Sequence, residues 1–360
     1  MVSYVQNVSS LQSLLSRQRT TNNMSSMIMK AETEVATGRH QDPFAALGAR
    51  SMEAMSARAV YERTQGRVES NTFLQNRLDL MATALGNMRE AAQEVLTATI
   101  TNTDASSSRP QYLKDMAKDA YDTIVSFLNS SYNGKSLFGG VDSDRAPMNS
   151  WGNADGTTGL SPSDVMASIV GGGITNAADA ATKLAEVDAV FNGTPTDPNH
   201  AYDETFFNGT PLTDGLGNPN PRMMAQIDES LDINYGVQGN DQGFRDLMRG
   251  LAMLASGDPA KIGDDDAYEA WVQAAAGALG SGVNSVLNAE TRTGTMQKLV
   301  EDANDRMSGK IEVLSLHISE LEAVDPYEAA TRLTSMQTQL QASYAVTSRL
   351  MQLSYLNFMR

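Results

Sequence analysis

Apolar residues recur at steps of three and four along two long segments, one toward each end of the chain. In the first segment they are Leu74, Leu78, Met81, Leu85, Met88, Ala92 and Val95. In the second they are Met296, Val300, Ala303, Met307, Ile311, Leu314, Ile318 and Leu321. Apolar residues at the a and d positions of successive heptads form the seam between packed helices. The pattern predicts two long helices with a bundle core that includes Leu74, Leu78, Met81, Leu85, Met88, Leu314, Ile318 and Leu321.

Shorter apolar stripes of the same kind lie nearer the two termini. The first consists of Met24, Ile28, Ala31 and Val35, and it ends before Gly38, a residue type that often follows the last turn of a helix. The second follows an Asp-Pro-Tyr-Glu turn at residues 325–328 and consists of Leu333, Met336, Leu340, Tyr344, Val346, Leu350, Leu353 and Leu356. A single stripe of this kind is typical of the core of an ordinary helical bundle. Stripes at both ends of one chain favour a long antiparallel helical bundle or coiled coil.

Proline and glycine are concentrated between the two helical segments. Seven of the 11 prolines and 14 of the 28 glycines lie within residues 139–240. Proline blocks helix interiors and glycine supplies turns, so this region should be a separate, turn-rich insertion. We therefore expect a mainly α protein with three parts. Residues 1–40 and 326–360 form terminal helices, residues 41–138 and 241–325 form the bundle, and residues 139–240 form a small α+β or β-rich middle domain.

Local signals within the insertion predict four elements. Ser161 is suited to cap a short helix, and residues 176–191 have the composition of a second helix. The stretches at 202–207 and 223–235 are predicted to be strands. In the latter, Ile227, Leu231 and Ile233 occupy alternating positions, which indicates one apolar face.

Composition and charge exclude several functional classes. The 43 acidic and 27 basic residues give a net charge of −16, which repels nucleic acid and anionic membrane surfaces, so neither is an expected partner. The absence of cysteine removes disulfides and thiol chemistry, and three isolated histidines disfavour an imidazole metal site. No apolar run is long enough to span a membrane, and the N-terminus does not have the pattern of a secretory signal peptide.

The two ends differ from the rest of the chain in charge. Residues 1–31 contain Arg17, Arg19 and Lys30 and no acid, and residues 329–360 contain Arg332, Arg349 and Arg360 and no acid. Each end therefore carries +3, and the two ends repel one another. Since their apolar stripes need another partner, we expect the ends to act in assembly, through Leu333, Met336, Leu340, Tyr344, Leu350, Leu353, Leu356, Met24, Ile28 and Val35.

The motifs that suggest chemistry are weak. Gly134-Lys135-Ser136 ends like a phosphate-binding loop, but the pattern requires a glycine at position 129, where the chain has Asn. The run Asp264-Asp265-Asp266 is better explained by a helix N-terminus than by calcium. Asn153, Asp155 and Gly156 lack the distal glutamate of a calcium loop. We predict no catalytic, cofactor-binding or metal-binding residue and no cofactor, and thus no enzymatic activity.

Several segments together resemble bacterial flagellins and their relatives. One is Glu34-Val35-Ala36-Thr37-Gly38-Arg39, followed by Asp42-Pro43 and residues 45–49. Another is Tyr132-Asn133-Gly134-Lys135-Ser136-Leu137-Phe138-Gly139-Gly140, with Ala146-Pro147 after it. The third comprises residues 325–332 together with the ending at 350–358. Their order and spacing, more than any one block, is similar to that of the family.

Within the family, residues 138–144, 236–245 and 325–332 are most similar to the junction proteins that lie between hook and filament. Flagellin, the bulk filament subunit, is the alternative. The resemblance implies a structural adaptor that forms a homo-oligomeric ring, with another hook-associated protein below it, flagellin above it and a flagellar export chaperone as a further partner. It also implies an extracellular location reached without a cleaved signal peptide, and terminal helices that are disordered in the monomer and form an inner tube on assembly.

A filament-like protein that carries a metalloprotease insert is a third possibility. It would require a His-Glu-x-x-His motif within residues 139–240, where His200 is the sole histidine. The sequence therefore disfavours this alternative.

Overall fold

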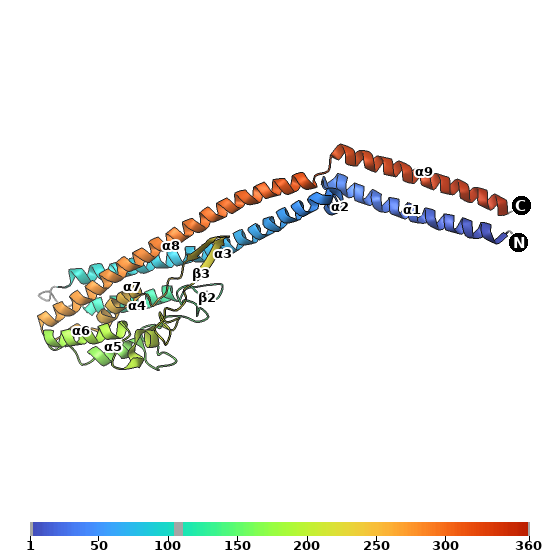
Figure 1. Cartoon of the computed structure of the whole chain (residues 1–360). Coiled ribbons are helices and arrows are strands. Elements are labelled where there is room, and N and C mark those ends of the chain that lie inside the picture. The colour runs from blue at the N-terminus through green and yellow to red at the C-terminus, as the bar shows by residue number, and fades with distance from the viewer. Residues whose placement is uncertain (1–2, 104–110, 359–360) are drawn as a thin grey trace. The chain divides into compact units, whose positions relative to one another are not determined.

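The computed structural model describes residues 3–103 and 111–358, without the side chains of residues 3–11, 13, 14 and 350–358. The chain divides into two compact units, which we call unit 1 (Met1–Gly66 with Arg306–Arg360) and unit 2 (Arg67–Asp305). The two longest helices, α3 (Ser51–Thr101) and α8 (Asp265–Glu322), contribute residues to both units (Figure 1). Long helices and two small sheets confirm the predicted mainly α fold with an α+β middle region.

Unit 1 is built around a pair of antiparallel helices, α1 (Ser3–Thr37) and α9 (Pro326–Phe358) (Figure 1). Gly38 ends α1 with a φ of 68°, and its N–H donates to the carbonyl of Glu34 at 2.8 Å. The Asp325 carboxylate begins α9 by accepting from the backbone N–H of Tyr327 at 2.8 Å. Both helix boundaries lie where glycine and the Asp-Pro pair predicted them. A short helix α2 (Pro43–Leu47) and a turn η1 (Gly48–Arg50) connect α1 to α3.

Unit 2 has a close-packed helical core. Helices α4 (Gln111–Leu128) and α7 (Gln242–Ser256) pack against each other, and α3 and α8 run along this body. Leu78, Met81, Leu85 and Met88 of α3 have no exposed surface. Burial of each such side chain contributes roughly 1.5–3 kcal/mol. The heptad pattern of α3 therefore corresponds to a real interior in this unit.

Polar contacts join α3 to α8 within unit 2. The Asn71 side-chain amide donates to Asn304 Oδ1 at 3.0 Å, and Arg89 Nε donates to Glu290 Oε2 at 2.9 Å. The Asp264 carboxylate accepts from the N–H of Ala267 at 2.7 Å. The first acid of the aspartate run therefore has the helix-capping role that the sequence favoured over calcium binding.

The Gly134-Lys135-Ser136 segment forms a tight hairpin. Strands β1 (Ser131–Tyr132) and β2 (Lys135–Ser136) pair antiparallel, and the two residues between them, Asn133 and Gly134, have φ values of 51° and 75°. Positive φ at both central positions is typical of a two-residue hairpin turn, for which Asn-Gly is the favoured sequence. No helix follows, so the segment is a turn and not a phosphate-binding loop.

The two helices predicted in the insertion are present. Helix α5 (Pro162–Val170) begins with a reciprocal cap, in which Ser161 and Asp164 each accept from the other's backbone N–H. Helix α6 (Ala177–Phe191) is capped by the Asn176 side chain, which accepts from the next turn at 3.0 Å. Unit 2 also contains the short turns η2 (Pro198–His200) and η4 (Pro259–Lys261).

The strand predictions need correction. Residues 202–206 form η3 (Tyr202–Phe206), a single π-helical turn, in which the N–H of Phe207 donates to the carbonyl of Tyr202 at 2.9 Å. The wider π turn lets Tyr202 and Phe206 stack at 5.5 Å between ring centroids, beside Phe191. Residues 223–235 form two antiparallel strands, β3 (Met224–Asp228) and β4 (Leu231–Asn234). Ile227 and Ile233 are buried, as the alternation predicted.

Candidate functional site

The α1–α9 pair of unit 1 buries a narrow line of small and medium-sized side chains. Ile28, Ala31 and Ala329 are buried, and the half-buried residues along the same line are Met24, Leu333, Met336 and Leu340. Two packed helices can each cover one face only, so the remaining faces stay open to solvent. Of the predicted assembly residues, these are the ones that lie at or near the contact between the two helices.

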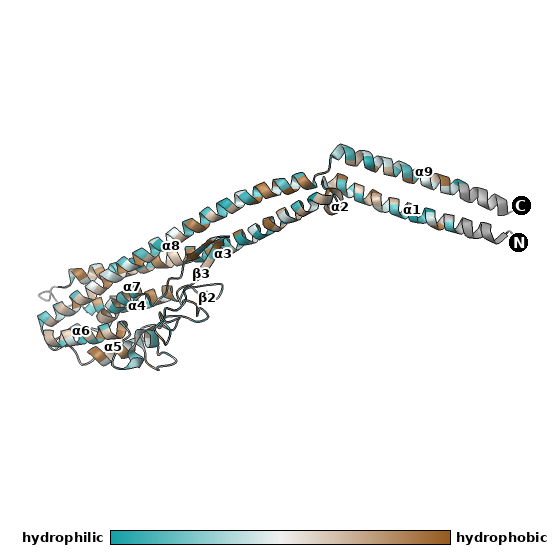
Figure 2. Ribbon diagram, viewed as in Figure 1, coloured by the Kyte–Doolittle hydropathy of each residue, from teal (hydrophilic) through white to brown (hydrophobic). Residues whose placement is uncertain are grey.

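Other predicted assembly residues lie on the open faces or outside the described side chains. Val35 is 41% exposed and Tyr344 is 56% exposed. The side chains of Leu350, Leu353 and Leu356 lie outside the described residues, although α9 extends to Phe358. Figure 2 shows apolar and polar residues mixed along the described part of both helices. The helix pair thus presents apolar side chains that nothing within one copy of the described chain covers.

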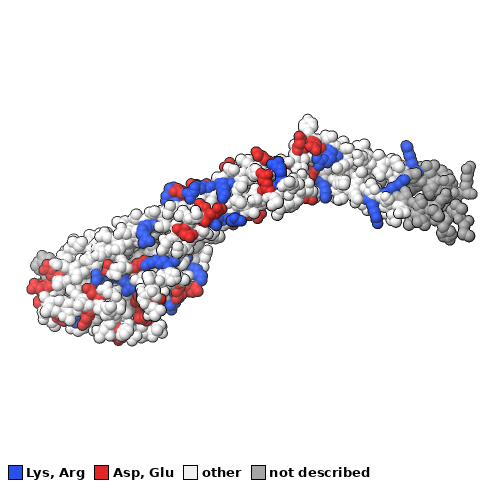
Figure 3. Space-filling model, viewed as in Figure 1, with Lys and Arg blue, Asp and Glu red and all other residues white. Residues whose placement is uncertain are grey.

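The charged side chains near the described end of the α1–α9 pair are all basic on the face that Figure 3 shows. The sequence accounts for this, because residues 1–31 contain three basic residues and no acid. Like charges on both helices weaken the pairing of an isolated copy.

Two chain segments cross where α1 ends and α9 begins. The N–H of His40 donates to the carbonyl of Glu322 at 2.9 Å, and the N–H of Val324 donates to the carbonyl of Gly38 at 3.0 Å. Arg39 and Ala323 form the antiparallel bridge between them. The two connections are therefore held to each other by backbone hydrogen bonds within unit 1.

A buried carboxylate reinforces this crossing. Glu322 is almost fully buried and accepts from Arg58 Nε and Nη2, each at 2.6 Å. The two hydrogen bonds raise the pKa of the Arg58 guanidinium above its ordinary value. A bidentate arginine–carboxylate pair fixes orientation as well as distance. It holds the end of α8 against the start of α3.

A second set of charges surrounds Glu34. Its carboxylate lies 3.6 Å from His40 Nδ1 and 3.4 Å from Arg332 Nη1, and it also accepts from the N–H of Gln41. Arg332 also pairs with Glu328 in its own helix. One acid of α1 thus contacts both the connection that follows it and the first turns of α9.

A pocket of about 310 Å³ opens beside the crossing, within unit 1. Phe44, Leu47 and Met55 line its apolar side. Arg39, Ser51 and Arg58 line its polar side, and Glu322 lies at its base through the pair with Arg58. Sequence reasoning did not identify this site, because its residues come from three helices and the connection after α1, and none of them belongs to a periodic stripe.

The predicted bundle-core residues are divided between the two units. Leu74, Leu78, Met81, Leu85 and Met88 are buried in unit 2. Ile318 and Leu321 are buried in unit 1, whereas Leu314 is half-buried there. That all eight residues serve as one continuous core stays a prediction.

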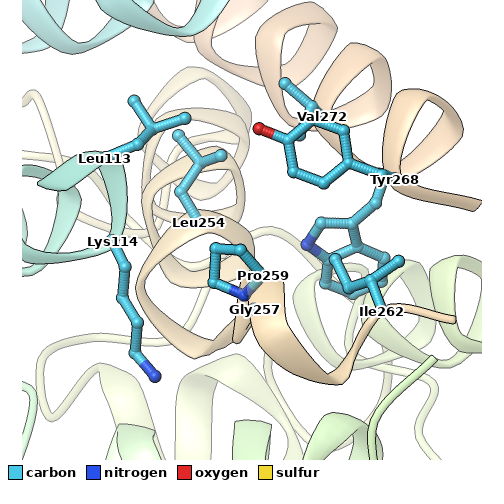
Figure 4. A pocket seen from close by; sticks show the side chains of 9 residues that line it. Leu113, Lys114, Leu254, Gly257, Pro259, Ile262, Tyr268 and Val272 are labelled. Atoms are coloured by element: carbon cyan, nitrogen blue, oxygen red, sulfur yellow. The ribbon is translucent and has the colours of Figure 1, made fainter. Parts of the chain in front are cut away.

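Two further features of unit 2, a small cavity and a buried aspartate, do not have the form of a catalytic site. The cavity in Figure 4, lined by residues such as Leu113, Leu254 and Ile262, measures about 20 Å³, which is room for about one water molecule. Asp155 is buried, but its carboxylate accepts from the N–H groups of Thr157 and Thr158. Within residues 3–103 and 111–358 there is no group of three or more acids and histidines placed to hold a metal ion. None of the described helices has the length and apolar character needed to cross a membrane.

A buried polar cluster around Arg245 in unit 2 was also not predicted from the sequence. Arg245 is buried, and its guanidinium donates to the carbonyls of Asn240 and Phe191 and pairs with Asp203 at 2.5 Å. It lies over the Tyr202 ring, at 5.0 Å from the centroid. Burial raises the pKa of Tyr202 well above its ordinary value. This cluster joins α6, α7 and η3 and is structural, because the Arg245 guanidinium and the Asp203 carboxylate have their partners within the fold.

Comparison with known families matches both ends of the chain. The description "bacterial flagellin N-terminal helical region" matches residues 8–143, and "bacterial flagellin C-terminal helical region" matches residues 276–359. Together these matches cover more than half of the chain, in the expected order. A comparison with curated proteins gave no match.

Among solved structures, one similar chain is described as a flagellar hook-associated protein from Vibrio parahaemolyticus. It shares 13% sequence identity, with 77% of this chain and 95% of that chain covered, at a TM-score of 0.35. A likeness this distant supports no conclusion about function, so assignment rests on the two family matches. The chain belongs to the bacterial flagellin family, whose members are structural, non-enzymatic components of the flagellum.

Proposed function

We propose that this protein is the hook–filament junction protein of a bacterial flagellum, hook-associated protein 3. It is a structural adaptor between the ring of another hook-associated protein and the flagellin filament. The observation that carries the proposal is that two sequence blocks similar to junction proteins, residues 138–144 and 236–245, pack against each other. They form the place where the inserted region leaves and re-enters the helical body.

The contact between these blocks is close and specific. The N–H of Gly239 donates to the carbonyl of Phe138 at 2.9 Å, and the rings of Phe138 and Phe244 lie 6.4 Å apart. Gly140 has a φ of 74°, and a Cβ at this position would come within 2.5 Å of Gln238 Nε2. A side chain at position 140 would therefore disturb the joint. The two blocks are best explained as one structural element, which strengthens the resemblance that each has separately.

The surfaces of unit 1 fit a protein that functions only when assembled. The α1–α9 pair exposes apolar side chains, and residues 1–31 carry basic residues and no acid. Neighbouring copies, arranged as a ring, would cover those faces, with a hook-associated protein on one side and flagellin on the other. An export chaperone would protect the same faces before secretion, and the cysteine-free chain is suited to export in an unfolded form.

Flagellin is the second candidate function, because the two family matches and the exposed helix pair would serve a bulk filament subunit equally well. The two functions differ in self-association. A filament subunit adds to its own kind without limit, whereas a junction protein stops after one layer between two different neighbours.

Localisation and seeded growth separate the two candidates. Antibody against this protein should label one spot at the base of each filament. Purified protein should remain monomeric when mixed with sheared filament fragments, under conditions in which flagellin elongates them. Labelling along the whole filament, or elongation of the fragments by this protein alone, would instead identify it as flagellin.

A further inference from the structure

Within one copy of the described chain, the pocket of unit 1 is open and the side chain of Tyr327 is 88% exposed. We propose that Tyr327 of one copy binds in the pocket of a second copy, and that this contact joins neighbouring copies in the flagellum. The proposal rests on the proposed function only in requiring that copies of this chain lie beside one another.

Tyr327 has the properties of a preformed anchor. It is 88% exposed, although it lies in the first turn of a long helix. Its backbone is held by the hydrogen bond to Asp325, and Ala329, two residues later, is buried. The side chain therefore projects from a fixed point. Tyrosine is enriched among the residues that dominate binding at protein interfaces, where it fills a pocket on the partner.

The pocket is large enough for a tyrosine side chain and offers suitable chemistry. Its volume of about 310 Å³ is at the lower end of the roughly 300–1,000 Å³ of pockets that hold small organic molecules. Phe44, Leu47 and Met55 can contact the faces of the phenol ring. Ser51 and the half-exposed guanidinium of Arg58 provide hydrogen-bond partners for its hydroxyl.

The charges around the two sites are complementary. Tyr327 is preceded by Asp325 and followed by Glu328, both of which are exposed. The pocket has Arg39, which forms no ion pair with any described residue, and Arg58, whose charge is balanced by Glu322. The carboxylate of Asp325 would thus meet the guanidinium of Arg39, whereas Glu328 and Arg58 are each balanced by a partner in their own chain. Complementary charges of this kind fix the register of an interface and disfavour wrong partners.

The geometry requires a second copy. Tyr327 does not line the pocket of its own chain, and Figure 1 draws the start of α9 and helix α2 on different sides of the end of α1. A contact in which two different patches meet is heterologous, and repetition of such a contact generates a ring or a helical array. One exposed tyrosine and one pocket in each copy are therefore sufficient to link successive copies.

Disulfide cross-linking tests the contact directly, because the natural chain contains no cysteine. The Tyr327→Cys/Met55→Cys double variant would be expressed in place of the native protein, and isolated flagella would be oxidised and analysed on non-reducing gels. We expect dimers and larger multimers. The matched control is Tyr327→Cys/Val313→Cys, since Val313 is also exposed in unit 1 but does not line the pocket. Equal yields from the two pairs, or no product in flagella that contain the test pair, would overturn the proposal.

A photoreactive aromatic residue covers the case in which the double variant does not assemble. Replacement of Tyr327 by p-benzoylphenylalanine keeps an aromatic side chain at this position. After irradiation, we expect a cross-linked peptide from residues 39–58 of a second copy, identified by mass spectrometry. Absence of such a peptide overturns the proposal. The outcome is separate from the proposed function: if the protein is a filament subunit, the same cross-links would occur along the whole filament.

Discussion

The interior of unit 2 and the α1–α9 pair of unit 1 have the same apolar spacing but very different burial. In unit 2, Leu78, Met81 and Leu85 have no exposed surface. In the α1–α9 pair, large apolar residues such as Tyr344 and Val346 are more than half exposed, and the most buried positions are Ala31 and Ala329. The difference arises because several elements surround the seam of α3, whereas two helices alone cannot enclose a large side chain. Heptad spacing therefore predicts a helix with an apolar face but not what covers that face.

The largest effect expected from this contrast is the loss of assembly on truncation. Removal of residues 329–360 takes away nearly all of α9 but no residue of unit 2. We expect circular dichroism of the truncated protein to keep a cooperative unfolding transition, and a deletion strain complemented with it to be non-motile. The full-length chain, expressed in the same deletion strain, is the control and should restore motility. Full motility of the truncated form would show that α9 is dispensable for assembly.

The second largest effect is expected at the buried arginine of unit 2. Arg245→Met removes the partner of Asp203 and leaves the carbonyls of Phe191 and Asn240 without their donor. Removal of one member of a buried ion pair costs about 3–5 kcal/mol. The control is Arg145→Met, because Arg145 and Asp142 form an exposed pair, and such a pair is worth about 0–1 kcal/mol. Chemical denaturation measures both variants, and equal losses would mean that the Arg245 cluster does not stabilise the unit.

Truncation of an aliphatic side chain to alanine compares a buried position of unit 2 with an exposed position of α9. Leu85→Ala in unit 2 should lower the free energy of unfolding by about 2–5 kcal/mol, because it leaves a cavity in a closed interior. Val346→Ala in α9 should change it by no more than about 0.5 kcal/mol, since the side chain is already largely exposed. Thermal unfolding provides the measurement. A loss at Leu85 as small as that at Val346 would contradict the buried seam.

The smallest effect is expected at a helix cap in the middle region. Ser161→Ala removes the side chain that accepts from the N–H of Asp164 at 3.1 Å. Loss of an N-cap costs about 0.5–2 kcal/mol. Ser168→Ala, an exposed position of the same helix that does not contact Ser161, leaves the cap in place and is the control. Chemical denaturation provides the measurement. An unchanged free energy of unfolding in Ser161→Ala would indicate that tertiary contacts alone position α5.

Local signals in the sequence were sufficient for the helical part of the fold. Gly38, the Asp325-Pro326 pair, Ser161 and Asn176 each mark a helix boundary, because a cap or a positive φ depends on a few adjacent residues. The strand predicted around Tyr202 failed for the opposite reason. A π-helical turn there is favoured by an aromatic cluster with Phe191, which is distant in sequence.

The candidate sites were less predictable than the fold. The Arg58–Glu322 pair joins residues 264 positions apart, and the pocket beside it combines residues of three helices and one connecting segment. Such sites depend on tertiary contacts that no periodic pattern encodes. Tyr327 was visible in the sequence as part of the Asp-Pro-Tyr-Glu turn, but its exposure was not, because that depends on which face of α9 meets α1.

We expect that the terminal helices need neighbouring copies to be stable, whereas unit 2 does not. Hydrogen exchange tests this expectation most directly when it is measured on both the monomer and assembled flagella. In the monomer, we expect amides of residues 12–37 and 326–349 to exchange rapidly, and those of residues 74–95 to be strongly protected. In assembled flagella, the terminal segments should become protected to a similar degree. If the terminal amides of the monomer were as strongly protected as those of residues 74–95, the terminal helices would not need neighbouring copies, which would contradict this expectation.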